Sequence, residues 1–161
     1  MLYCCFTHSP DAALLAISAR RILALDPEAV IVAASDASAP IPQKLLPAGV
    51  LHRETAFPRS GNLNGLDCIA GMVAFMADLC QEFEADHKFD ADLWANNLAA
   101  FLTSTDSTSY DYLATERWHF AQPAGYIYRI SSRLLERLLA EITSRRAANL
   151  FPPDNKYPED Q

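Results

Sequence analysis

The sequence lacks an excess of basic residues. Its 161 residues include 13 Lys and Arg against 20 Asp and Glu, for a formal net charge of −7 at pH 7. Binding to nucleic acid irrespective of its sequence depends on clustered cations, so we expect no nucleic-acid partner. Half of the residues are hydrophobic and a fifth are charged. This ordinary balance excludes a disordered, collagen-like or coiled-coil chain and predicts one globular domain over residues 1–161.

Long apolar runs and paired metal-binding cysteines are also missing. No stretch approaches the roughly 20 apolar residues of a membrane span, and no basic region precedes an apolar one as in a signal peptide. The cysteines show neither Cys-x-x-Cys nor Cys/His ligand spacing. We therefore expect no membrane span, a cytoplasmic location and four reduced, mostly buried thiols, which are Cys4, Cys5, Cys68 and Cys80.

Two short apolar runs, residues 2–6 and 29–34, lack alternation and are typical of strands buried on both faces. Between them the sequence predicts a helix with Ser9 as N-cap and Pro10 in its first turn, ending at about Leu25. Arg20 lies away from the apolar stripe, which comprises Leu14, Leu15, Ile22 and Leu25. Strand, helix and strand in this order predict an α/β fold with a mostly parallel central sheet flanked by helices.

Further elements follow along the chain. We expect a short strand at 50–52, a long helix over 66–83, a helix over 96–102, an exposed loop over 103–112 and a strand over 125–130. Ser131 or Ser132 caps a last helix that runs to about Arg146. The inward positions expected on the long helix are Ile69, Met72, Val73, Met76, Cys80 and Phe83, and those on the last helix are Leu134, Leu135, Leu138, Leu139 and Ile142.

Polar residues follow the first two predicted strands and would share one edge of a parallel sheet. Asp36 ends the second of these strands, where a carboxylate can accept hydrogen bonds from a base or a ribose. An Asx-turn or a helix cap is an equally good interpretation of Asp36. Thr7, His8 and Ser9 follow the first strand, and His8 is also compatible with an ordinary loop histidine.

Asp90 and Asp92 are candidate metal ligands. Residues two apart at a strand end project to the same side, and two carboxylates form a hard oxygen site for Mg²⁺ or Mn²⁺. A cation held there can stabilise a diphosphate leaving group. Taken alone, Asp-x-Asp is common in solvated loops, so the spacing by itself leaves both interpretations open.

The loop that precedes the long predicted helix is a candidate phosphate-binding segment. Arg59 supplies a cation, Asn62 supplies an amide, and the helix start favours anions. The loop matches neither the P-loop nor the Gly-x-Gly-x-x-Gly fingerprint, and a structural turn explains its composition equally well. In the tail, Glu159 or Asp160 could act as a general base, whereas the composition there also suits simple disorder.

In chain order these motifs resemble those of GT-A-fold glycosyltransferases, close to glycosyltransferase family two. The resemblance runs from the first strand with Thr7, through Asp36 and the Arg59 loop, to Asp90 and Asp92 and the final acidic pair. It departs from the family in three respects. The segment before Asp90 is short and polar, 161 residues are few for this fold, and the chain stops at the acidic pair. These departures suggest a small, truncated or reduced member.

The resemblance implies metal-dependent transfer of a sugar from a nucleoside-diphosphate sugar, UDP-sugar foremost, to an unidentified acceptor with inversion. Thr7, His8, Ser9, Asp36, Arg59 and Asn62 would bind the nucleotide, and Asp90 and Asp92 would hold Mn²⁺ or Mg²⁺. Asp160, or else Glu159, would deprotonate the acceptor. Two alternatives stay open. One is a non-catalytic, nucleotide-binding remnant of the same fold, and the other is a different metal-dependent phosphate enzyme such as a nucleotidyltransferase.

Overall fold

The computed structural model describes residues 1–7, 9–56, 66–85, 88–89, 112–117 and 122–148. Helices and strands alternate through the first half of the chain, as the sequence predicts. In chain order the elements are β1 (Leu2–Phe6), η1 (Ser9–Asp11), α1 (Ala12–Leu25), β2 (Val30–Asp36), η2 (Gln43–Leu45), β3 (Val50–Thr55), α2 (Leu66–Phe83), β4 (Lys88–Phe89), β5 (Tyr112–Arg117), β6 (Gln122–Ile130) and α4 (Ser132–Ala147).

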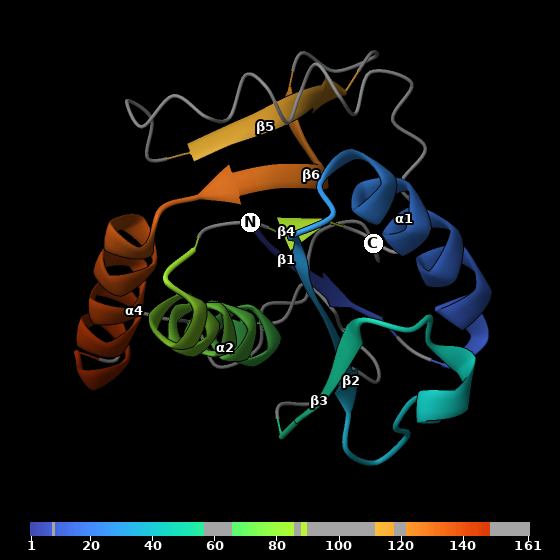
Figure 1. Cartoon of the computed structure of the whole chain (residues 1–161). Helices are drawn as coiled ribbons and strands as arrows, with labels where there is room; N and C mark the ends of the chain where they lie inside the picture. The colour runs from blue at the N-terminus through green and yellow to red at the C-terminus, as the bar shows by residue number, and fades with distance from the viewer. Residues whose placement is uncertain (8, 57–65, 86–87, 90–111, 118–121, 149–161) are drawn as a thin grey trace.

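The strands form one six-stranded sheet in the order β3-β2-β1-β4-β6-β5 (Figure 1). β3, β2, β1 and β4 are parallel, β6 runs antiparallel to β4, and β5 runs antiparallel to β6. The predicted α/β class with a mostly parallel sheet is therefore confirmed. No helix in the described part of the chain is long and apolar enough to cross a membrane.

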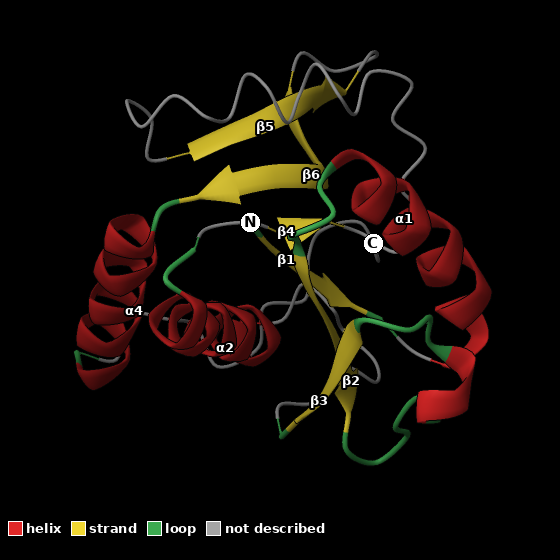
Figure 2. Ribbon diagram, in the orientation of Figure 1, coloured by secondary structure: helices red, strands yellow, loops and turns green. Residues whose placement is uncertain are grey.

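Helices cover both faces of the sheet, with α1 on one face and α2 and α4 on the other (Figure 2). β1 contributes side chains to the core on both faces of the sheet, because successive side chains along a strand point to opposite faces. Tyr3 and Cys5 join a buried cluster with α1, whereas Leu2, Cys4 and Phe6 join a second cluster with α2 and α4. Every residue of β1 is buried, which explains its unbroken apolar sequence.

The order of the strands accounts for the opposite placement of α1 and α2. The chain passes from β1 to β2 in one direction through α1, and from β3 to β4 in the reverse direction through α2. Crossovers between parallel strands are almost always right-handed. Reversing the direction of travel therefore places the second helix on the other face of the sheet.

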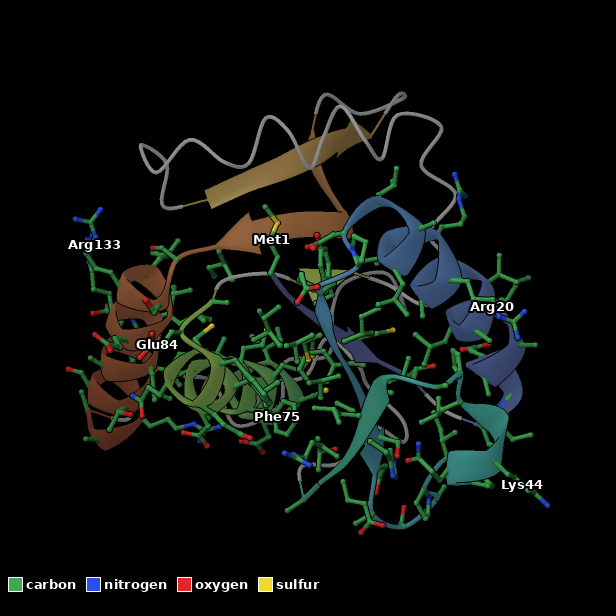
Figure 3. The ribbon with its side chains drawn as sticks, in the orientation of Figure 1. Met1, Arg20, Lys44, Phe75, Glu84 and Arg133 are labelled. Carbon is green, nitrogen blue, oxygen red and sulfur yellow. The ribbon has the colours of Figure 1, made fainter. Side chains whose placement is uncertain are left out.

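α1 differs in detail from its prediction. Ser9 lies in the 3₁₀ turn η1, and the N-cap of α1 is Asp11, whose side chain makes no capping hydrogen bond. Leu25 is 49% exposed and Leu14 is only half-buried. Both were predicted to point inward, but the buried stripe is Ala12, Leu15, Ser18, Ala19 and Ile22. Arg20 is exposed as expected, and Figure 3 shows it pointing away from the sheet.

α2 begins and ends where the sequence predicts, and its last three turns contact the sheet. Met76 and Cys80 are buried, and the ring of Phe75 meets that of Phe6 edge-on at 5.7 Å between centroids. Ile69, expected to face inward, is instead exposed near the amino end of the helix. All four cysteines are buried thiols, as expected.

α4 confirms its predicted cap but buries less than its sequence suggests. The Ser131 hydroxyl accepts a hydrogen bond from the Leu134 amide at 3.1 Å. Leu135 is fully buried, whereas Leu138 is 37% exposed, which makes its inward assignment wrong. The reason is that α4 packs on α2 at the border of the sheet, so within the described residues a narrow stripe of the helix is buried.

β6 is longer than predicted, and β5 was not predicted. β6 spans Gln122–Ile130 rather than 125–130 alone. Tyr112, the first residue of β5, was placed in an exposed loop. The sequence of β5 carries charged residues, which suit an edge strand, and among the described strands β5 pairs with β6 alone. The predicted helix over 96–102 lies outside the described residues.

Replacing Glu84 by glycine is expected to stabilise the protein. Glu84 follows the last residue of α2 and has φ of 53°, a left-handed conformation that costs a non-glycine residue about 1–2 kcal/mol. Part of this gain is offset by the greater backbone entropy of glycine in the unfolded chain. We expect Glu84→Gly to raise the free energy of unfolding in urea by about 0.5–1 kcal/mol.

The matched control for this variant is Asp78→Gly. Asp78 is an exposed residue inside α2, where glycine costs about 1 kcal/mol relative to alanine. The two substitutions should therefore shift stability in opposite directions. A loss of stability in Glu84→Gly comparable with that in Asp78→Gly would contradict the assignment of a strained helix terminus.

Candidate functional site

The carboxyl ends of β1, β2, β3 and β4 meet at one edge of the sheet because these strands are parallel. Phe6 lies beside Ala34, and Asp36 lies beside Thr55. The order in which the chain adds strands reverses at β1, because β2 and β3 lie on one side of β1 and β4 lies on the other. This edge is where open α/β sheets bind their ligands, at the point where the strand order reverses.

Thr7 continues β1 at this edge. Its amide donates a hydrogen bond to the Ala34 carbonyl at 2.9 Å, which extends the ladder between β1 and β2 by one residue. The side chain is 2% exposed, and its Oγ1 has no hydrogen-bond partner within the described residues. A buried hydroxyl in this condition costs about 1–3 kcal/mol, so the position is poised to bond an incoming polar group.

Asp36 lies at the last position of β2 and is half-buried. Its Oδ1 accepts a hydrogen bond from the Ser38 amide at 2.8 Å, and its carbonyl accepts one from the Ala39 amide at 3.0 Å. The Asx-turn interpretation is therefore confirmed. The turn holds the Asp36 carboxylate at the edge of the sheet, one strand away from Thr7.

A polar cluster that the sequence did not predict lies directly behind Asp36. Ser35 is fully buried, and its Oγ lies 2.7 Å from Nε2 of His52 on β3. The Ile41 amide donates to the same oxygen at 3.2 Å, and the Thr55 hydroxyl donates to the Ser35 carbonyl at 3.1 Å. The only signal for this contact in the sequence was His52, which lies on the short strand predicted after the one that leads into Ser35.

The remaining predicted site residues are only partly covered. Ser9 lies in η1, just beyond Thr7. His8, Arg59, Asn62, Asp90, Asp92, Glu159 and Asp160 lie outside the described residues.

The described side chains that could bind a metal are dispersed over the structure. Within those ranges no group of three or more His, Cys, Asp or Glu side chains comes together in a way that could hold a metal ion. Asp36 is the described carboxylate at the end of β2, and Thr7 contributes a hydroxyl. One carboxylate and one hydroxyl supply fewer oxygen ligands than the roughly six or more that Mg²⁺ and Ca²⁺ usually take.

Comparison with known proteins adds no relative. A scan against protein-family models gives no match, and a search of curated proteins finds no similar sequence. The features that bear on function are therefore the strand order, the edge formed by Thr7 and Asp36, and the motifs in the sequence.

Proposed function

We propose that the protein binds a nucleoside-diphosphate sugar at the carboxyl edge of β1, β2 and β4 and transfers the sugar to an acceptor, as a small GT-A-type glycosyltransferase. The observation that carries the proposal is the buried hydroxyl of Thr7, which has no partner within the described ranges, at the reversal of strand order between β1 and β4. The ordered motifs of the sequence supply the choice of nucleotide sugar among the ligands that such an edge can bind.

Each predicted site residue has a role in this proposal. Thr7 and Asp36 hydrogen-bond the nucleoside, with His8 and Ser9 beside Thr7 in the chain. Arg59 and Asn62 contact the diphosphate ahead of α2, whose amino end favours anions. Asp90 and Asp92, which follow β4 in the sequence, hold Mn²⁺ or Mg²⁺, and such a cation supplies positive charge next to the diphosphate. Asp160, or else Glu159, takes the proton of the acceptor hydroxyl.

A nucleotide-binding protein without transferase activity is the second candidate. The observation that favours it lies in the sequence, because the segment before Asp90, residues 86–89, is short and polar where members of the resembled family have a strongly apolar strand. This candidate predicts that nucleotide binds while no donor sugar is transferred or hydrolysed.

Calorimetric titration with UDP, with and without Mn²⁺, tests the proposal. Binding that requires Mn²⁺ supports a nucleotide site, and turnover in a screen of UDP-sugars then separates the transferase from the second candidate. Absence of UDP binding in both conditions would contradict both candidates.

Thr7→Val is expected to weaken UDP binding without destabilising the fold. Valine keeps the shape of threonine and removes a hydroxyl that has no partner among the described residues. Loss of one hydrogen bond to the ligand should lower UDP affinity about three- to tenfold, whereas the melting temperature should hold or rise.

Thr55→Val is the matched control, because the Thr55 hydroxyl is buried and already donates to the Ser35 carbonyl. This variant should lower the melting temperature, since it leaves a buried carbonyl without its side-chain donor. Equal UDP affinity in Thr7→Val and the unmodified protein would remove Thr7 from the site.

A further inference from the structure

The hydrogen bonds around Ser35 define the direction in which its proton points. The hydroxyl oxygen accepts from the Ile41 amide and lies 2.7 Å from Nε2 of His52. A serine hydroxyl has a single proton to donate. Ser35 is fully buried, so that proton needs an acceptor within the protein, and in the described part of the structure the acceptor in reach is Nε2 of His52.

This arrangement assigns the tautomer of His52. With the Ser35 hydroxyl donating to Nε2, the ring carries its own proton on Nδ1. If Nε2 carried the proton instead, Ser35 would receive two donors and its own buried proton would be left without an acceptor. His52 therefore acts as an acceptor that keeps the lone pairs of Ser35 directed at the Ile41 amide.

The same bonds shape the segment between β2 and η2. Three hydrogen bonds within residues 35–41 hold this segment in a turn. Ile41 donates to Ser35, Ser38 donates to the Asp36 carboxylate, and Ala39 donates to the Asp36 carbonyl. Ser35 and Asp36 are consecutive, so the hydroxyl that accepts the hydrogen bond from the Ile41 amide lies one residue from the Asp36 carboxylate. A change in the orientation of the Ser35 hydroxyl thus acts directly on the turn that holds Asp36.

We propose that His52 is a positioning residue, which fixes the Asp36 carboxylate for nucleoside binding through the Ser35 hydroxyl and the turn over residues 36–41. The proposal rests on the proposed function for the role of Asp36. A nucleophile–base pair is a poor description of Ser35 and His52, because Ser35 is completely buried and its oxygen is already engaged by the Ile41 amide.

The test compares His52→Leu and His52→Gln by calorimetry with UDP and Mn²⁺. Leucine removes the acceptor, and we expect UDP affinity to fall about tenfold. The side-chain amide of glutamine offers an oxygen near the place of Nε2, so His52→Gln should keep affinity within about threefold of the unmodified protein. Leu51→Gln is the control, because Leu51 precedes His52 on β3 and points to the opposite face of the sheet.

A second measurement does not need the nucleotide. Amide hydrogen exchange of Ile41 and Ser38 reports the two hydrogen bonds that the proposal links. Both amides should exchange about tenfold faster in His52→Leu and stay protected in His52→Gln and Leu51→Gln. Ser35→Ala should give the same acceleration, and combining it with His52→Leu should add little, because both act through one hydroxyl.

The two measurements separate failure of the proposal from failure of the proposed function. If the unmodified protein does not bind UDP, the proposed function fails, and exchange of the Ile41 and Ser38 amides alone decides the role of His52. Unchanged exchange in a folded His52→Leu, or equal loss of UDP affinity in the leucine and glutamine variants, would overturn the positioning role.

Discussion

Leu15→Ala is expected to lower the free energy of unfolding by about 3 kcal/mol, within the range of 2–5 kcal/mol typical of buried leucines. Leu15 is fully buried in the first turn of α1, in the cluster that contains Tyr3, Ile22 and Ile31. Truncation removes the transfer free energy of the side chain and leaves a cavity. The central sheet strands form one wall of this cavity, and they cannot collapse inward without breaking their hydrogen bonds.

Leu25→Ala provides the matched comparison on the same helix. Leu25 is 49% exposed, so the identical chemical change should cost less than about 1 kcal/mol. Urea denaturation of both variants measures the difference. Similar losses in the two variants would mean that α1 does not present the face described above to the sheet.

Asp92→Ala is expected to abolish the Mn²⁺-dependent part of UDP binding. In proteins, loss of a residue that only supports a metal ligand already lowers metal affinity about 10–100-fold. In the proposed function Asp92 is a direct carboxylate ligand, so its loss should weaken Mn²⁺-dependent UDP binding by more than about a hundredfold. Calorimetry with UDP at fixed Mn²⁺ measures this, and any binding measured without the metal should be unaffected.

The control for Asp92→Ala is Asp78→Ala, which removes one negative charge from the exposed face of α2. It should leave UDP binding unchanged, because a single exposed charge is largely screened at physiological salt. If Mn²⁺-dependent binding persists in Asp92→Ala, the cation site must be sought elsewhere in the chain.

For α2 and α4, local sequence pattern predicted where the helix begins and ends better than it predicted which side chains the helix buries. The bounds of α2 and the cap at Ser131 follow from spacing and capping chemistry within a few residues. The exposure of Leu25 and Leu138 does not, because burial depends on how much partner surface each helix meets. In the described part of the chain α4 packs mainly on α2, so its apolar stripe is wider than this contact.

Part of the candidate site could be predicted from the sequence and part of it could not. Thr7 and Asp36 could be placed at one edge from the sequence, since both follow buried strands of a parallel unit. The contact between Ser35 and His52 could not, because it depends on the register of β2 against β3. In that register His52 pairs with Ala33 and reaches Ser35 diagonally. Shifting β3 by one residue would turn His52 to the opposite face of the sheet.

The central position of β1 has a consequence for the order in which the protein can fold during synthesis. The cluster under α1 is drawn from Tyr3 to Val50, so it can assemble once the first third of the chain has emerged. The cluster under α2 also needs Ile130 and Leu135. One face of β1 is therefore covered only in part until the ribosome has made α4, and contacts so distant in sequence form slowly. β1 is made before the other described strands, yet its enclosure is complete only after all of them have been made.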